Sequence, residues 1–129
     1  RVYPGVGPDA GWLPVERVAE DPWLAGWPRH FAPLHWHGDT FELPKGATHL
    51  ASSAAYAQQA FRLGSALGLQ FHVEATEEMA RSWMEDDALP PAWRTEAGQV
   101  LRCGEAASAM APLAASLGRA LAAAILAKT

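Results

Sequence analysis

The stretch Gly68-Leu69-Gln70-Phe71-His72-Val73-Glu74 carries the most informative pattern in this sequence. Its apolar residues predict a strand, and the strand ends in an imidazole and a carboxylate. Because side chains alternate along a strand, His72 and Glu74 point to one side and Val73 to the other. A carboxylate beside an imidazole can accept its Nδ1 proton and leave the second ring nitrogen free to act as a base. The pair can supply two members of a catalytic triad; the alternative is an ordinary surface pair.

The sequence on the N-terminal side of this stretch predicts further short strands. Residues 59–63 and 67–72 flank a Gly-Ser pair and predict a β-hairpin. Gly38-Asp39 predicts a turn between two short strands. The remaining strands are predicted, in chain order, within the Gly- and Pro-rich residues 1–32, on both sides of that turn in residues 34–43, and at residues 49–52.

Two helices are predicted on the C-terminal side. Thr76 is a suitable N-cap for the first, Glu77 and Glu78 place negative charge in its first turn, and Pro90-Pro91 cannot continue it. Pro112 is expected in the first turn of the second helix. Apolar residues at spacings of three and four then give this helix a stripe that must cover another surface, formed by Met110, Leu113, Leu117, Leu121 and Ile125.

Composition sets limits on the class of protein. The 129 residues, 50% of them hydrophobic and 19% charged, suffice for one globular domain. A net charge of -4 argues against a nucleic-acid binder. The single cysteine, Cys103, predicts a reducing, cytoplasmic location. The longest apolar run, residues 120–127, is shorter than the roughly 20 residues that span a bilayer, so no membrane segment is expected.

The stretch around His72 resembles the terminal triad motif of class I glutamine amidotransferases, usually Gln-Phe-His-Pro-Glu, with Val73 in place of the proline. The departure lies between His72 and Glu74 and changes neither of them. Five further pieces of the family pattern precede it in the right order. They are Val2-Tyr3-Pro4-Gly5, Gly11-Trp12, His35-Trp36-His37-Gly38-Asp39-Thr40-Phe41-Glu42-Leu43-Pro44, Ala51-Ser52-Ser53 and Gln59-Ala60-Phe61.

The resemblance implies an α/β fold, the C-terminal part of a flavodoxin-like amidotransferase domain. Residues 1–84 would form that half-domain, and residues 85–129 a helical extension packed on it. The implied reaction is hydrolysis of glutamine to glutamate and ammonia by a Cys-His-Glu triad. His72 and Glu74 would be its catalytic residues, and its cysteine would lie outside this chain. No cofactor is implied.

The resemblance also implies residues and partners for binding. In the GMP-synthase-like branch, a similar His-Gly-Asp lies beside the glutamine pocket, so Trp36 and His37 are expected to line that pocket unless they only shape a turn. The expected partners are glutamine or a γ-glutamyl substrate, the missing N-terminal half or a second copy of the chain, and a synthase that accepts the ammonia. Neither nucleic acid nor a membrane is expected.

Several alternatives remain open at this point. The chain could be a non-catalytic amidotransferase-like binding module, or a γ-glutamyl hydrolase, which shares the fold and the triad. A metal site at His35, His37 and Asp39 is a further alternative to the expected absence of a metal, because these residues alternate on one strand and suit zinc. Cys103 is not expected to be the nucleophile, because it follows His72 and lacks the Gly-x-Cys-x-Gly elbow; it is expected in a helix, as a small core residue.

Overall fold

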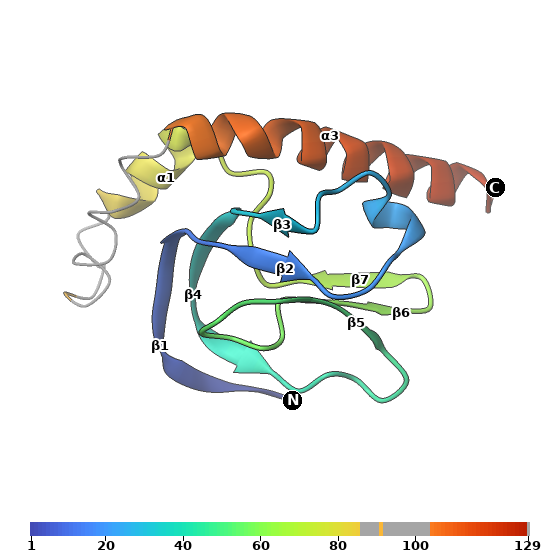
Figure 1. The fold of residues 1–129 in the computed structure, drawn as a ribbon, viewed down its shortest axis with the longest axis horizontal. Coiled ribbons are helices and arrows are strands. Elements are labelled where there is room, and N and C mark those ends of the chain that lie inside the picture. The colour runs from blue at the N-terminus through green and yellow to red at the C-terminus, as the bar shows by residue number, and fades with distance from the viewer. Residues whose placement is uncertain (86–90, 92–103, 129) are drawn as a thin grey trace.

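The structure of the chain, a computed structural model, describes residues 1–85, 91 and 104–128 (Figure 1). The described residues form two sheets, with helices along one side. The elements are β1 (Val2–Trp12), β2 (Val15–Arg17), a 3-10 helix η1 (Pro22–Leu24), β3 (His30–Phe31), β4 (Leu34–Phe41), β5 (Thr48–Ser52), β6 (Ala60–Leu63), β7 (Ala66–Leu69), α1 (Glu77–Met84) and α3 (Gly104–Leu126).

The first sheet consists of β1 and β4, paired antiparallel. The predicted turn at Gly38-Asp39 is wrong, because β4 runs through both residues as one strand. The irregularity lies in β1 instead: Pro4 pairs with Asp39 and Asp9 pairs with His37, so four residues of β1 face Gly38 alone. This bulge in β1 absorbs the mismatch in length, and β4 keeps its extended backbone.

The second sheet has five strands in the order β3-β2-β5-β6-β7, and every pairing between them is antiparallel. The predicted hairpin is confirmed as β6 and β7, joined at Gly64, whose φ of 56° favours glycine. The predicted strand at residues 49–52 is confirmed as β5. The strand predicted to reach His72 ends earlier, at Leu69.

Beyond β7, the chain turns from the second sheet to the first. His72 forms an isolated antiparallel bridge with Leu34, in which each backbone N–H donates to the other residue's carbonyl, at 2.8 and 3.2 Å. Because Leu34 is the first residue of β4, this bridge ties the segment after β7 to the β1/β4 sheet. The predicted site residues therefore lie where the two sheets meet.

Helix α1 begins as predicted. The Thr76 hydroxyl accepts a hydrogen bond from the Met79 amide, and Glu77 and Glu78 occupy the first turn. The helix ends at Met84 with Glu85 as its C-cap. Pro90 lies outside the described residues, so its predicted role in stopping the helix remains a prediction.

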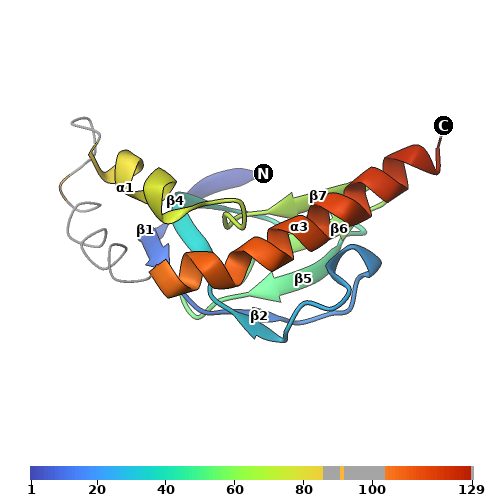
Figure 2. The same cartoon turned by 90° about the horizontal axis from the view of Figure 1, so that it is seen from above.

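Helix α3 runs along the five-stranded sheet, as Figures 1 and 2 show. Its apolar stripe is confirmed in part: Met110 and Leu117 are buried, whereas Ile125 is 65% exposed. The prediction for Pro112 is wrong, because the described helix already begins at Gly104 and Pro112 lies inside it. Cys103, expected to be a small core residue, lies outside the described residues.

By length and composition alone, residues 105–126 of α3 could cross a membrane, with a mean hydropathy of 1.6. The uninterrupted apolar run, residues 120–127, is shorter than this helix. On its N-terminal side the sequence remains rich in alanine and poor in charged residues, which extends the apolar segment. In the structure, one side of the helix joins the protein core. Met110 and Leu117 belong to the same hydrophobic core cluster as Leu24 of η1, although only 11% of the apolar segment of the helix is buried.

The mixture of sheets and helices confirms the predicted α/β class. A parallel sheet, which the flavodoxin-like comparison implies, is not seen among the described strands, all of which pair antiparallel. A tight turn dictates this direction only for β6 and β7, because two residues cannot join parallel neighbours. The division into a half-domain at residues 1–84 and an extension at residues 85–129 stays a prediction.

Candidate active site

His72 and Glu74 are paired. The His72 Nδ1 atom lies 2.7 Å from Glu74 Oε1, and the side chains are 34% and 57% exposed. An ionised carboxylate only accepts hydrogen bonds, so this contact places the imidazole proton on Nδ1 and leaves Nε2 as a base. This is the geometry that the sequence predicted for the pair.

The neighbouring residues hold the pair in place. Phe71 and Val73 are both buried in the core, so the side chain of the intervening His72 is directed out of it. The Leu34 bridge fixes the backbone of the same residue. His72 is therefore held by two apolar anchors and two backbone hydrogen bonds, although it lies beyond the end of β7.

Two tryptophans extend the site. The Trp83 ring of α1 packs edge-on against His72, with ring centroids 5.2 Å apart, and Trp36 lies 6.0 Å from Trp83. Trp36, predicted to line the glutamine pocket, is thus on the side of β4 that faces the His72–Glu74 pair. Sequence reasoning missed Trp83 as part of the site, because its contact with His72 depends on how α1 packs and not on a motif.

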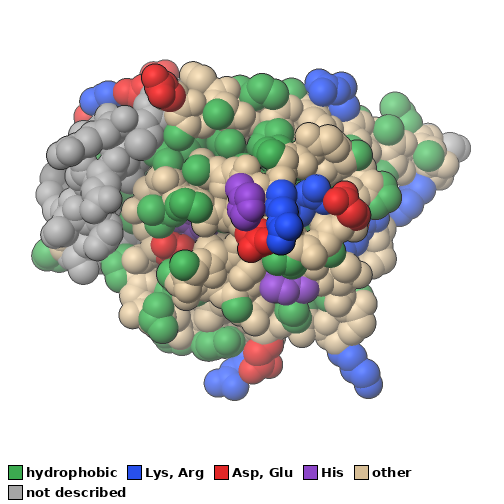
Figure 3. All heavy atoms as spheres, in the orientation of Figure 1, with side chains coloured by type: hydrophobic (Ala, Val, Ile, Leu, Met, Phe, Trp, Pro, Cys, Tyr) green, Lys and Arg blue, Asp and Glu red, His purple; other side chains and the backbone are tan. Residues whose placement is uncertain are grey.

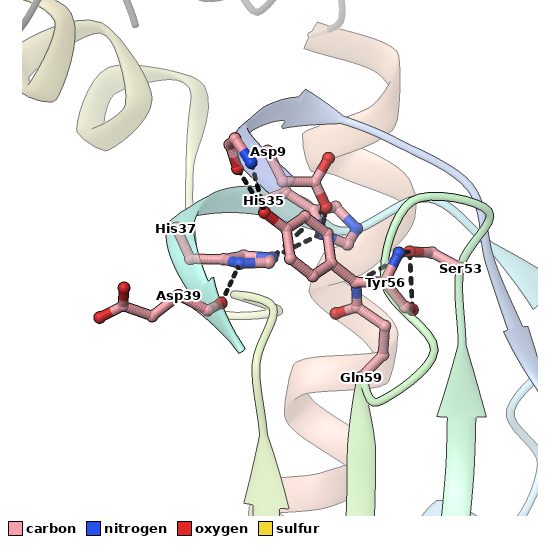
Figure 4. A network of polar contacts seen from close by, with 8 residues as sticks. Asp9, His35, His37, Asp39, Ser53, Tyr56 and Gln59 are labelled. Atoms are coloured by element: carbon pink, nitrogen blue, oxygen red, sulfur yellow. Dashed lines mark hydrogen bonds and ion pairs between the residues drawn. The ribbon is translucent and has the colours of Figure 1, made fainter. Parts of the chain in front are cut away.

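His37 lies on the opposite face of β4 from Trp36, as alternation along a strand requires. There it joins His35 and Asp9 in a buried polar cluster (Figure 4). The predicted role of His37 in glutamine binding stays a prediction. The geometry places its side chain in this cluster, away from His72.

The cluster is close-packed. The Asp9 Oδ2 atom lies 3.1 Å from His35 Nδ1 and 3.4 Å from His37 Nε2, and the two nitrogens are 3.4 Å apart. Burial alone would raise the pKa of Asp9, but the two adjacent imidazoles outweigh it and hold the pKa well below its ordinary value. The carboxylate is therefore ionised in the folded protein.

Asp9, and not Asp39, is the carboxylate that meets the two histidines. The Asp39 side chain is exposed, and only its backbone carbonyl contacts His37, at 3.0 Å from Nδ1. Sequence reasoning missed Asp9 because it is 26 residues from His35 and becomes its neighbour only through the β1/β4 pairing. No local spacing indicates that contact.

Tyr56 closes the cluster on one side. Its ring packs edge-on against His37, with centroids 4.9 Å apart, and its hydroxyl donates to the Gly7 carbonyl and accepts from the Gly7 amide. Gly5 has no side chain that would collide with this ring. Tyr56 thus joins the loop after β5 to the bulge of β1.

Several charged side chains outside these sites form ion pairs. Arg29 lies 2.7 Å from Glu16, and Arg17 lies 2.5 Å from Glu20. On the face in Figure 3, basic and acidic side chains meet near the centre.

The fold matches solved glutamine amidotransferases. A glutamine amidotransferase from Thermotoga maritima superposes with a TM-score of 0.79 and 31% identity, over 94% of this chain and 54% of that one. A glutamine amidotransferase from Methylobacillus flagellatus gives a TM-score of 0.76 and 25% identity, with the same coverage. The resemblance to class I glutamine amidotransferases indicated by the motifs is confirmed.

A GMP synthase (glutamine-hydrolyzing) from Thermomicrobium roseum is 41% identical over 75 residues, which are 57% of this chain and 14% of that protein. No family model matches the chain. The chain spans about half the length of the two solved structures and a much smaller part of the synthase. Over that part of their length, the chain is similar to glutamine amidotransferases.

Proposed function

We propose that the protein containing this chain hydrolyses glutamine to glutamate and ammonia, and that His72 and Glu74 are the base and its orienting carboxylate. The observation that carries the proposal is the 2.7 Å contact between His72 Nδ1 and Glu74 Oε1. It fixes the tautomer in which Nε2 can accept a proton. The relationship to glutamine amidotransferases supports the choice of an amide substrate.

In the proposed reaction, His72 takes the proton of a cysteine thiol supplied by the rest of the protein. The thiolate attacks the side-chain amide carbon of glutamine, and the C–N bond breaks as His72 returns the proton to the departing ammonia. Water activated by the same imidazole then hydrolyses the thioester and releases glutamate. Glu74 stays ionised and stabilises the imidazolium that forms at each step.

Trp36 and Trp83 are proposed to form a wall beside the reacting groups. The ring of Trp83 contacts both Trp36 and the ring of His72, which supports this proposal. Such a wall lowers the local dielectric and strengthens the interaction between Glu74 and a protonated His72. We propose Trp36 as the residue of this wall that contacts the substrate, as the sequence suggested.

The ammonia is proposed to pass to a synthase domain or partner. The relationship to a glutamine-hydrolysing GMP synthase supports this proposal. A cytoplasmic location belongs to the same proposal. The proposed acceptor rests on the family, and the proposed location rests on the single cysteine of the sequence.

The test is ammonia release from glutamine by the complete protein. His72→Ala is expected to abolish turnover, and Glu74→Gln to reduce it less, because the imidazole remains but loses its ionised partner. Glu42→Gln, at an exposed carboxylate whose ion pair with Arg1 lies away from the triad, is the matched control and is expected to leave turnover unchanged. An unchanged rate in His72→Ala would remove the amidotransferase mechanism.

A further inference from the structure

The Asp9–His35–His37 cluster lies on the face of β4 opposite the proposed active site and has no part in the proposed reaction. We propose that it binds one divalent transition-metal ion of the zinc type. The ligands would be Asp9 Oδ2, His35 Nδ1 and His37 Nε2. Four features of the structure support this assignment, and none depends on glutamine hydrolysis.

The first feature is the spacing of the three ligand atoms. Their separations are 3.1, 3.4 and 3.4 Å. A tetrahedral zinc ion about 2.0–2.1 Å from each ligand separates the ligand atoms by about 3.3–3.4 Å. Two of the three separations have this value, and the third, between Asp9 and His35, is slightly shorter.

The second feature is the tautomer of His37. Its Nδ1 lies 3.0 Å from the Asp39 carbonyl, which can only accept, so Nδ1 carries the proton. The Nε2 lone pair then points into the cluster. A hydrogen bond from the distal ring nitrogen to a backbone carbonyl is the usual way in which proteins orient a metal-binding histidine.

The third feature is the state of Asp9. The residue is only 6% exposed, and no donor among the described residues is aligned for a hydrogen bond to its Oδ2. A buried carboxylate oxygen without a hydrogen bond is costly unless a positive charge compensates it. A metal ion at the centre of the cluster supplies that charge.

The fourth feature is the position of His35. Its Nδ1 meets His37 Nε2 at 3.4 Å, so the metal-free cluster can hold one proton between the two rings. Metal binding at Nδ1 moves the His35 proton to Nε2. That atom is buried without a partner among the described residues, so neither tautomer is favoured by a hydrogen bond there. The metal ion would take the place of the proton between the two rings, and that proton would stay on His35 at Nε2, so both imidazoles bind in their neutral form.

The ligand chemistry selects the kind of ion. Two imidazoles and one carboxylate suit Zn²⁺ or Co²⁺, whereas Mg²⁺ and Ca²⁺ prefer oxygen ligands throughout. The Tyr56 ring covers the His37 side of the cluster. Water would complete the coordination, since three protein ligands leave one tetrahedral position.

Cobalt titration of the metal-free full chain tests the proposal. We expect one equivalent of Co²⁺ to bind with the strong visible absorption of tetrahedral cobalt, and zinc to displace it. Asp9→Asn and His37→Gln are each expected to weaken binding at least about 10- to 100-fold, the loss seen when only a hydrogen bond to a metal ligand is removed. The controls are Asp39→Asn and the exposed His30→Ala, which should bind as the unsubstituted chain does.

Nuclear magnetic resonance of the unsubstituted chain gives a second test. It uses no variant, so a substitution that impairs folding cannot affect its result. On addition of zinc, the ring nitrogen signals of His35 Nδ1 and His37 Nε2 should shift together, and those of His30 should not. Two outcomes would overturn the proposal: absence of stoichiometric binding, which would leave only a shared proton in the cluster, or binding that Asp9→Asn leaves unchanged.

Discussion

Tyr56 shows how one side chain can hold a bulge and a buried cluster together. Its hydroxyl bonds both backbone groups of Gly7, and its ring packs on His37. Four residues of β1 that face only Gly38 of β4 would otherwise have fewer backbone partners. The phenol thus replaces part of a missing strand ladder, and it places Asp9 at the end of the bulge beside the histidines.

Tyr56→Phe is expected to lower the free energy of unfolding by about 1–2 kcal/mol, because the two backbone groups of Gly7 lose their partner while the ring stays. Urea unfolding monitored by circular dichroism measures the change. Tyr3→Phe is the control, because Tyr3 lies on β1 but the hydroxyl that bonds Gly7 belongs to Tyr56, and it should have little effect on the free energy of unfolding. Equal stability of the two variants would mean that water serves Gly7 as well as the hydroxyl does.

At the scale of elements, the sequence predicted those parts of the fold that depend on contacts between residues close together in the chain. The β6/β7 hairpin follows from alternating residues around a glycine turn, and the start of α1 follows from Thr76 and two acidic residues. The continuous β4 could not be predicted, because the bulge that matches it lies in β1. The Asp9 contacts depend on the same distant pairing, so no spacing within β4 revealed them.

The close packing of β6 on β7 gives a prediction for Gly68, which precedes His72 by four residues. A methyl group at Gly68 would collide with the Phe61 ring, and that ring also packs on Phe41, with centroids 5.4 Å apart. Gly68→Ala is therefore expected to destabilise the fold by about 1–3 kcal/mol, the usual cost of overpacking.

Gly118→Ala is the matched control for this substitution. Gly118 is exposed on α3, and nothing lies within 4 Å of the position of an added methyl group. Alanine there should stabilise the helix by about 0.5–1 kcal/mol, since glycine has more conformational freedom to lose. Thermal unfolding of both variants measures the two changes in stability, which should have opposite signs. An unchanged stability of Gly68→Ala would show that the Phe61 ring can turn aside.

The whole molecule presents a sheet edge and an apolar groove. Among the described strands, β7 has a neighbour only on the β6 side. Beside it, α3 and the sheet enclose an apolar groove of about 300 Å³, lined in part by Trp23, Leu67, Leu69, Leu117 and Leu121. An open edge and an exposed apolar surface are rarely left uncovered in soluble monomers. The chain spans about half the length of the related solved structures, and we propose that the rest of the protein covers this surface.

The 129-residue chain produced alone is therefore expected to lack glutaminase activity and to associate, either with the remaining half of the domain as a second chain or with itself. Light scattering and an assay of ammonia release measure both properties. Ile125→Glu, at an exposed residue that lines the groove, should weaken self-association without unfolding the chain. Ala122→Glu, exposed on the same helix but outside the groove lining, should not. A stable, active monomer would contradict the prediction, because it would require a nucleophile within this chain.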